Sequence, residues 1–282
     1  MLIAKSQITR HKPSNVYEAR RKRRPMKGCI AHYLAVERGG STVYDVSGRH
    51  ENLAFPGGGA DPTRVGEKYG PSLSFDDASS NRAGRMSPII SGFPFSICVW
   101  AKLDDNSINH VLFSIGDSSA ANGWFAINAA GGSNDEIIAF TNSPSSGSFG
   151  NSPQTSTAFV VGEWFCAVGV WAASNDVRVY LNGLGKDTST YAHNVNMGNL
   201  DNVVMGRTAD STPSAPTSGI IDEVQVFSRV LDDGEVKFLS APANRFHEFG
   251  RTSLLISPAA AGAVTSLLAA RSDYRHQGVY RL

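Results

Sequence analysis

The stretch FSICVWAKL at Phe95–Leu103 decides the fold class, because its apolar side chains stand at every second position. Such alternation predicts a β-strand with one buried face. Similar segments recur between turns rich in Gly, Ser, Asn, Asp and Pro, and we expect further strands at 110–115, 124–128, 136–141, 165–171, 177–181 and 219–227. Many short strands at regular spacing predict an all-β chain folded as an antiparallel two-sheet sandwich.

Helix is expected in one short piece, at 232–239. Asp232 can cap its first turn, and Glu235 stands where a capping box has its acid. Leu231 and Val236 occupy the two positions of a hydrophobic staple. We expect this helix to close the last strand, 219–227, against the sandwich.

The composition is that of a globular protein with a buried core. The 282 residues are 41% hydrophobic and 18% charged, and the 28 Gly and 13 Pro favour short strands over long helices. Three cysteines cannot supply a disulfide framework, and no Cys/His cluster has the spacing of a zinc site. No stretch has the pattern of a signal peptide, and the apolar stretch 254–270 is too short and too weak for a membrane span, so we expect no membrane partner.

Charge is distributed unevenly, although the formal net charge is only +1. Residues 1–27 carry nine basic groups and one acid (+8), residues 28–240 carry 12 basic and 22 acidic groups (−10), and residues 241–282 carry five Arg and two acids (+3). Such asymmetry is typical of a globular body with interaction tails. We therefore expect an extended basic N-terminal arm (1–27), a folded domain (28–240) and a C-terminal tail (241–282).

The candidate docking residues in the arm form one basic run, Arg20, Arg21, Lys22, Arg23 and Arg24. We favour an arm that grips an acidic protein surface. A solvated tail and an arm that contacts nucleic acid phosphates remain alternatives. Nucleic acid comes last, because no aromatic residues interleave with the basic run for base stacking.

Several segments together carry a family resemblance. They are HYL at 32–34 with GSTVYDVSGRHEN at 40–52, KYGPSLSFD at 68–76, FSICVWAK at 95–102, EWFCAV at 163–168, VRVYLNG at 177–183 and GIIDEVQVFSRVL at 219–231. In this order they resemble laminin-G-like, concanavalin A-like jelly-roll domains, over roughly residues 28–240. The resemblance implies a two-sheet jelly roll that binds glycans or proteins, often with calcium, but a fold does not fix a function.

The pattern of acidic residues indicates a protein without enzymatic activity. A glycanase of this fold needs two carboxylates ~5–9.5 Å apart across the scissile bond. Here the candidate acids are adjacent pairs, which point to opposite faces of a strand: 76–77, 104–105, 135–136, 222–223 and 232–233. Nucleophile-elbow, metalloprotease and phosphate-loop motifs are also missing from the sequence.

Asp222 is the most informative acid. By alternation it shares the apolar face of Ile220, Val224 and Val226, while Glu223 and Gln225 face water. A carboxylate on an apolar face needs compensation. We favour backbone N–H groups of a neighbouring loop as its partners. The alternative is a structural Ca²⁺ site, in which the resemblance implies Asp45 or Asp76 as further ligands.

Two tryptophans are candidate sugar platforms. Trp100 lies opposite the apolar run of its strand, and Trp124 follows the turn Asn122-Gly123 and is expected near a rim. For both we favour packing in the sandwich or under a loop over sugar binding, since Trp is usually highly buried. Trp164 and Trp171 are expected in the core.

The flanks of the domain look like those on laminin-G-like proteins of bacteriophage particles. A binding fold without an export signal fits a particle that is assembled in the host cytoplasm and released by lysis. We therefore expect a non-enzymatic virion structural protein, displayed on the exterior of a phage-like particle as a head decoration or tail component and anchored by its arms. The expected partners are other virion proteins, such as the major capsid or tail proteins, further copies of the chain, and a surface glycan in host attachment. A free carbohydrate-binding module and a divergent glycoside hydrolase remain alternatives.

Overall fold

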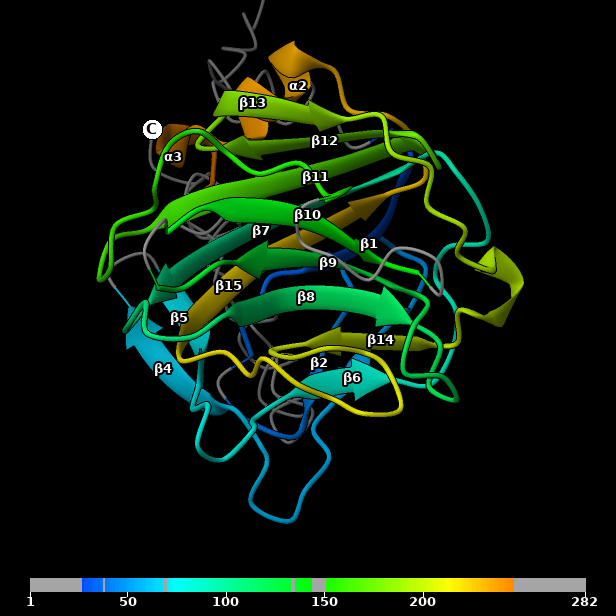
Figure 1. The fold of residues 1–282 in the computed structure, drawn as a ribbon. Helices are drawn as coiled ribbons and strands as arrows, with labels where there is room; N and C mark the ends of the chain where they lie inside the picture. The colour runs from blue at the N-terminus through cyan, green and yellow to red at the C-terminus, as the bar shows by residue number, and fades with distance from the viewer. Residues whose placement is uncertain (1–26, 38, 68–69, 133–134, 144–150, 246–282) are drawn as a thin grey trace, which may run out of the picture.

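The computed structural model describes residues 27–37, 39–67, 70–132, 135–143 and 151–245. Within these residues, antiparallel strands form two sheets that pack face to face as a sandwich (Figure 1). The predicted all-β jelly roll is thereby confirmed. The basic run at 20–24 and the tail beyond residue 245 lie outside the described residues.

Sheet A contains eight strands in the described part of the chain. They are β1 (Cys29–Tyr33), β4 (Thr63–Glu67), β5 (Gly70–Phe75), β7 (Phe95–Leu103), β11 (Phe165–Ala173), β12 (Asp176–Leu181), β13 (Leu184–Ser189) and β15 (Gly219–Phe227). Their order is β13-β12-β11-β7-β15-β5-β4, and β1 also pairs with β15.

Sheet B contains seven strands among the described residues. They are β2 (Thr42–Val43), β3 (Leu53–Ala54), β6 (Ala83–Arg85), β8 (His110–Gly116), β9 (Trp124–Ala129), β10 (Ile137–Asn142) and β14 (Asn202–Met205), in the order β10-β9-β8-β14-β6-β3-β2. The helices of the described residues are η2 (Met197–Asn199), α2 (Asp233–Leu239) and α3 (Pro242–Arg245). No helix in the described ranges is long and apolar enough to cross a membrane.

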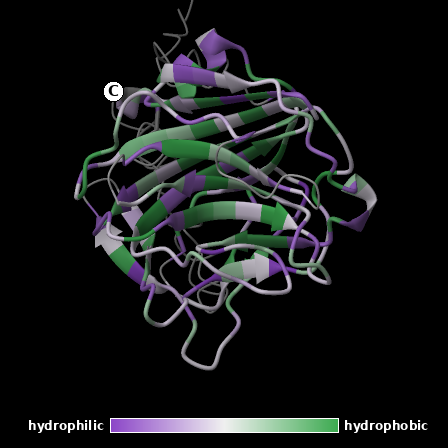
Figure 2. Cartoon of the chain, viewed as in Figure 1, coloured by the Kyte–Doolittle hydropathy of each residue, from purple (hydrophilic) through white to green (hydrophobic). Residues whose placement is uncertain are grey.

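The main core fills the space between the sheets. Hydrophobic residues alternate with polar ones along several strands (Figure 2), and the inward residues of β7 and β9 are fully buried. Trp171 is at the centre, where its ring stacks on Phe95 at a centroid distance of 4.9 Å and its indole N–H donates to Thr141 Oγ1 over 2.9 Å. The core prediction is confirmed for Trp171. It is wrong for Trp164, which is half-buried with the Lys102 ammonium 5.6 Å from its ring centroid.

Helix α2 covers the outer face of sheet A. Its side chains Val236 and Leu239 pack against Trp100, Cys98 and Cys166 in a second apolar cluster. The helix begins as predicted, because the Asp232 side chain accepts from the Glu235 N–H over 2.8 Å and Glu235 completes the capping box. Phe227, the last residue of β15, belongs to the same cluster, so the helix packs beside the end of the last strand as well as on β7 and β11.

A bulge in β15 changes which side chains face the core. Ile221 pairs with Ala101 and Val224 with Val99, so β15 has one residue more than β7 in this interval. Ile221, Val224 and Val226 all belong to the main core, so the prediction that Asp222 shares the face of Val224 and Val226 is wrong. The prediction that Glu223 and Gln225 face water is also wrong.

The outer face beside this bulge holds a buried polar group. Glu223 and Gln225 are only 3% and 1% exposed. His32 Nε2 lies 2.8 Å from Glu223 Oε1 and 3.2 Å from Gln225 Nε2. Glu223 and Gln225 can be buried here because β1 lies beside β15 and supplies His32 as a partner for both side chains.

Candidate functional site

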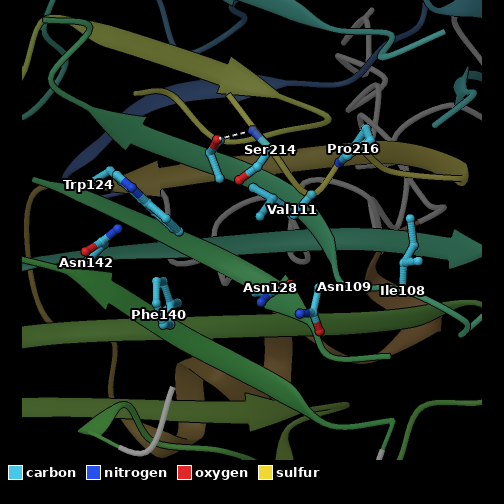
Figure 3. A pocket seen from close by; sticks show the side chains of 11 residues that line it. Ile108, Asn109, Val111, Trp124, Asn128, Phe140, Asn142, Ser214 and Pro216 are labelled. Carbon is cyan, nitrogen blue, oxygen red and sulfur yellow. Dashed lines mark hydrogen bonds between the residues drawn. The ribbon is translucent and has the colours of Figure 1, made fainter. Parts of the chain in front are cut away.

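A pocket of about 510 Å³ lies on the face of sheet B that is turned away from the core (Figure 3). Its floor consists of outward residues of β8, β9 and β10. Trp124 pairs directly with Asn142, and Val111 pairs with Asn128. The Phe140 ring lies against Trp124, with 4.8 Å between the ring centroids. The floor is therefore an aromatic and aliphatic surface with amide groups at its margins.

The loop from 206 to 218 forms one wall of the pocket. It is fixed to β8 because the Val111 N–H donates to Ala215 O over 2.9 Å and Thr217 Oγ1 donates to Val111 O over 2.8 Å. Within the loop, the Ser214 N–H donates to Thr208 Oγ1 over 2.7 Å, as the dashed line in Figure 3 shows. These hydrogen bonds hold the backbone of the wall in place, so the position of the wall does not depend on a bound ligand.

Gly116 allows the loop to lie close to β9. A Cβ at this position would lie 2.7 Å from Trp124 Cβ and 2.8 Å from Ala209 O, both closer than real contacts of this kind. A side chain here would push the loop away from Trp124. The glycine is therefore part of what shapes the pocket.

Three polar atoms of the pocket lining are buried and have no hydrogen-bond partner within the described residues. They are Trp124 Nε1, Asn128 Oδ1 and Asn142 Oδ1. Trp124 is 6% exposed and Asn128 is 1% exposed. Because native proteins rarely leave buried polar atoms unpaired, and each such atom costs about 1–3 kcal/mol, these three mark a place where a polar ligand would be favourable.

The lining is also uncharged. Among the described residues that form it, apolar side chains stand beside three asparagines, a serine and a threonine, and there is no acid, base or histidine. The pocket therefore has no side chain that could act as a general acid, general base or carboxylate nucleophile.

The two predicted sugar platforms have different environments. Trp124 lines the pocket beside Phe140. Trp100 does face away from the core, but α2 covers it, and its indole N–H donates to Leu239 O over 3.3 Å. Because the side chains of α2 pack over Trp100, its ring is not open to a sugar, which corrects the expectation for this residue.

The three aspartates considered for calcium do not gather into one group within the residues that the structure describes. No group of three His, Cys, Asp or Glu side chains in the described part of the chain is close enough to hold a metal ion. Asp222 is half-buried on β15, and Asp76 lies exposed in a turn, where it accepts from the Ala78 N–H and the Ser79 hydroxyl. The structure therefore does not bring these aspartates together as the set of converging carboxylates that we considered for calcium.

Asp45 is committed to hydrogen bonds instead. Its two oxygens accept from the N–H groups of His32, Ser47 and Glu51 and from the Ser47 hydroxyl, at 2.8–3.0 Å. Burial alone would raise the pKa of the Asp45 carboxyl, but these donors outweigh it and hold the pKa below its usual range. Asp45 thus fulfils, in another loop, the backbone-binding role that we favoured for Asp222.

The sequence reasoning missed Asn128, Phe140 and Asn142. A usable signal exists for the asparagines. In WFAIN at 124–128, alternation places Trp124 and Asn128 on one face, and in β10 it places Phe140 and Asn142 on one face. Polar residues that share a strand face with aromatic ones are uncommon in a pure core and indicate a binding surface.

The chain matches a known protein family. A laminin G family model, described as the concanavalin A-like lectin/glucanases superfamily, matches residues 79–237. The search of curated proteins gave no match.

Several solved structures are similar in fold. Domain 4 of AbnA, an extracellular arabinanase from Geobacillus stearothermophilus solved with arabinotriose, has a TM-score of 0.58 at 17% identity, over 76% of this chain and 98% of that one. Trypanosoma rangeli sialidase has a TM-score of 0.55 at 14% identity, over 77% of this chain and 33% of that one. The binding domain of botulinum neurotoxin DC, solved with SialylT, has a TM-score of 0.53 at 11% identity, over 76% and 51% of the two chains. At such identities the likeness establishes the fold alone.

Proposed function

The chain belongs to the concanavalin A-like lectin/glucanase superfamily, and we propose that its jelly roll is a non-enzymatic glycan-binding domain with its site in the sheet B pocket. The observation that carries this proposal is the set of three unpaired polar atoms around a floor of Trp124 and Phe140. Sugars combine apolar C–H faces with hydroxyl groups that both donate and accept. A ring surface edged by unpaired amide and indole groups suits that combination.

The lack of an acidic side chain among the described lining residues supports binding rather than cleavage, since glycoside hydrolysis needs a pair of carboxylates. The domain of the arabinanase that was solved with arabinotriose lends further support, because this chain covers 98% of it. Release of reducing ends from a polysaccharide by this chain would contradict the non-enzymatic assignment.

A glycan array probed with the full chain tests the proposal. The variant Trp124→Phe keeps a ring beside Phe140 but removes the unpaired N–H, and we expect retention on the bound glycans to fall about tenfold. Trp164→Phe is the matched control outside the pocket, and it should bind as the wild type does. Failure of the wild type to bind any glycan, or equal binding by Trp124→Phe, would refute the proposal.

We further infer that the domain is displayed on the exterior of a phage-like particle as a virion structural protein. The support is its charge distribution, a domain of −10 between ends of +8 and +3. The first residue of the domain, Gly28, accepts from the Ser228 N–H over 2.9 Å beside sheet A, where the last strand has just ended, whereas the pocket is on sheet B. Anchoring through both ends would therefore leave the pocket free.

Deletion of residues 2–24 tests this second inference. We expect the truncated chain to be lost from purified particles, as measured by mass spectrometry, while its melting temperature stays that of the full chain. Incorporation at the wild-type level would refute anchoring by the arm. Reversing the charges at 20–24 tests the alternative, in which the arm contacts nucleic acid. Weaker retention on DNA, with incorporation into particles unchanged, would assign the basic run to nucleic acid binding.

A further inference from the structure

We infer that the sheet B pocket takes an uncharged glycan and rejects the corresponding sialylated or uronic acid-containing glycan. This inference rests on the proposed function and names the ligand class of the same site. Two independent observations carry it, namely the chemistry of the lining and the charge of the whole domain.

The lining offers no cation to a carboxylate. Its described residues include no Lys, Arg or His. A carboxylate that entered would lose its water and gain no opposite charge, which is strongly unfavourable. In SialylT-type ligands the acidic group would have to remain outside the pocket.

The unpaired atoms favour hydroxyl groups over carboxylates. Asn128 Oδ1 and Asn142 Oδ1 are acceptors and Trp124 Nε1 is a donor. A hydroxyl can donate to either oxygen and accept from the indole, whereas a carboxylate can only accept. These atoms have almost no contact with bulk water, so a ligand reaches them only as it fills the pocket and the side chains adjust. Each hydrogen bond then forms where water does not compete.

The domain itself repels anions. Residues 28–240 carry 22 acidic and 12 basic groups. Such a field lowers the local concentration of acidic glycans, although only over about 10 Å at ordinary salt. The lining therefore sets the selectivity at contact, and the net charge acts in the same direction on approach.

A paired array tests the inference with the full chain. It carries neutral oligosaccharides, each beside the same oligosaccharide with a terminal sialic acid or with one hexose replaced by its uronic acid. We expect the neutral member of each bound pair to be retained at least about tenfold better. We also expect its retention to be unchanged between 50 and 500 mM NaCl. Stronger, Trp124-dependent binding of acidic members would overturn the inference and leave glycan binding intact, whereas no binding at all would refute the proposed function itself.

A designed cation supplies the converse test. Ile108 lies at the pocket rim and is 39% exposed, so Ile108→Lys places a positive charge beside the ligand. We expect acidic glycans to gain about two- to fivefold in affinity. Leu184→Lys adds the same charge on β13 of sheet A, at a site that is 64% exposed, and is the matched control. Equal gains in both variants would overturn the assignment of selectivity to the pocket.

Discussion

Replacing Asp45 with Asn tests whether this carboxylate organises the loop around it. Its Oδ1 accepts from the His32 and Ser47 N–H groups, both at 2.8 Å, and its Oδ2 accepts from the Ser47 hydroxyl at 2.8 Å and the Glu51 N–H at 3.0 Å. An amide keeps one oxygen and turns an NH₂ group toward two donors. Hydrogen bonds to a charged group contribute about 1.5–3 kcal/mol each, so losing two predicts a fall of about 3 kcal/mol in the free energy of unfolding. We use the lower end of the range for each hydrogen bond, because Ser47 is half-buried and its hydroxyl can turn to water.

Urea unfolding of the full chain at pH 7, followed by tryptophan fluorescence, measures this loss. The matched control is Asp76→Asn, because Asp76 is exposed and its carboxylate accepts from two donors, the Ala78 N–H and the Ser79 hydroxyl, among the described residues. We expect the control to lose less than about 1 kcal/mol. A loss below about 1 kcal/mol in Asp45→Asn would refute the reasoning.

The same variant predicts a pH dependence. The pKa of Asp45 is held below its usual range, so its contribution is fully present above the unfolded-state pKa of about 3.9. It is lost as the pH falls through the lower, folded-state pKa. The stability difference between the wild type and Asp45→Asn should therefore shrink as the pH is lowered from about 4. A difference that stays constant down to pH 2 would contradict this mechanism.

Three further predictions concern the metal, the pocket and the helix. EDTA should leave the melting temperature unchanged, because hydrogen-bond donors already occupy the Asp45 oxygens, and a rise on adding Ca²⁺ would contradict this. Gly116→Ala should lower the free energy of unfolding by about 1–3 kcal/mol and weaken glycan binding, because the new Cβ would lie 2.8 Å from Ala209 O. The control Gly92→Ala, whose Cβ meets nothing within 4 Å, should change neither quantity. Asp232→Ala removes the cap of α2 and should lower the free energy of unfolding by about 1 kcal/mol. It should also speed the reaction of Cys98 and Cys166 with a thiol reagent, because the helix packs over them. Unchanged thiol reactivity would show that the helix does not shield them.

Local patterns predicted the local features of this fold. The alternation in Phe95–Leu103 predicted β7, and the spacing of Asp232 and Glu235 predicted α2, because each signal lies within one element. The faces of Asp222 and Glu223 could not be predicted in this way. The bulge depends on how β15 pairs with β7, and alternation within one strand carries no information about an extra residue in the pairing.

The candidate site was predictable only in part. The sequence indicated Trp124 and the outward direction of Trp100. It could not show that α2, whose Leu239 lies 139 residues further along the chain, would cover Trp100. It also could not show that the loop from 206 to 218 would be fixed to Val111 and turn a flat strand surface into a pocket.

The pairing of the first and last strands of sheet A determines how the domain bears mechanical load. Antiparallel β1 and β15 pair Cys29 with Phe227 and Tyr33 with Val224, so the start of β1 and the end of β15 lie at the same end of this strand pair. Tension applied between the start of β1 and the end of β15 would unzip these strands one hydrogen bond after another. A pull from a ligand on sheet B against both ends together would instead load the strands in shear across the sandwich. The fold is therefore mechanically suited to be mounted on a surface by both ends, and poorly suited to be an in-line link in a stretched chain.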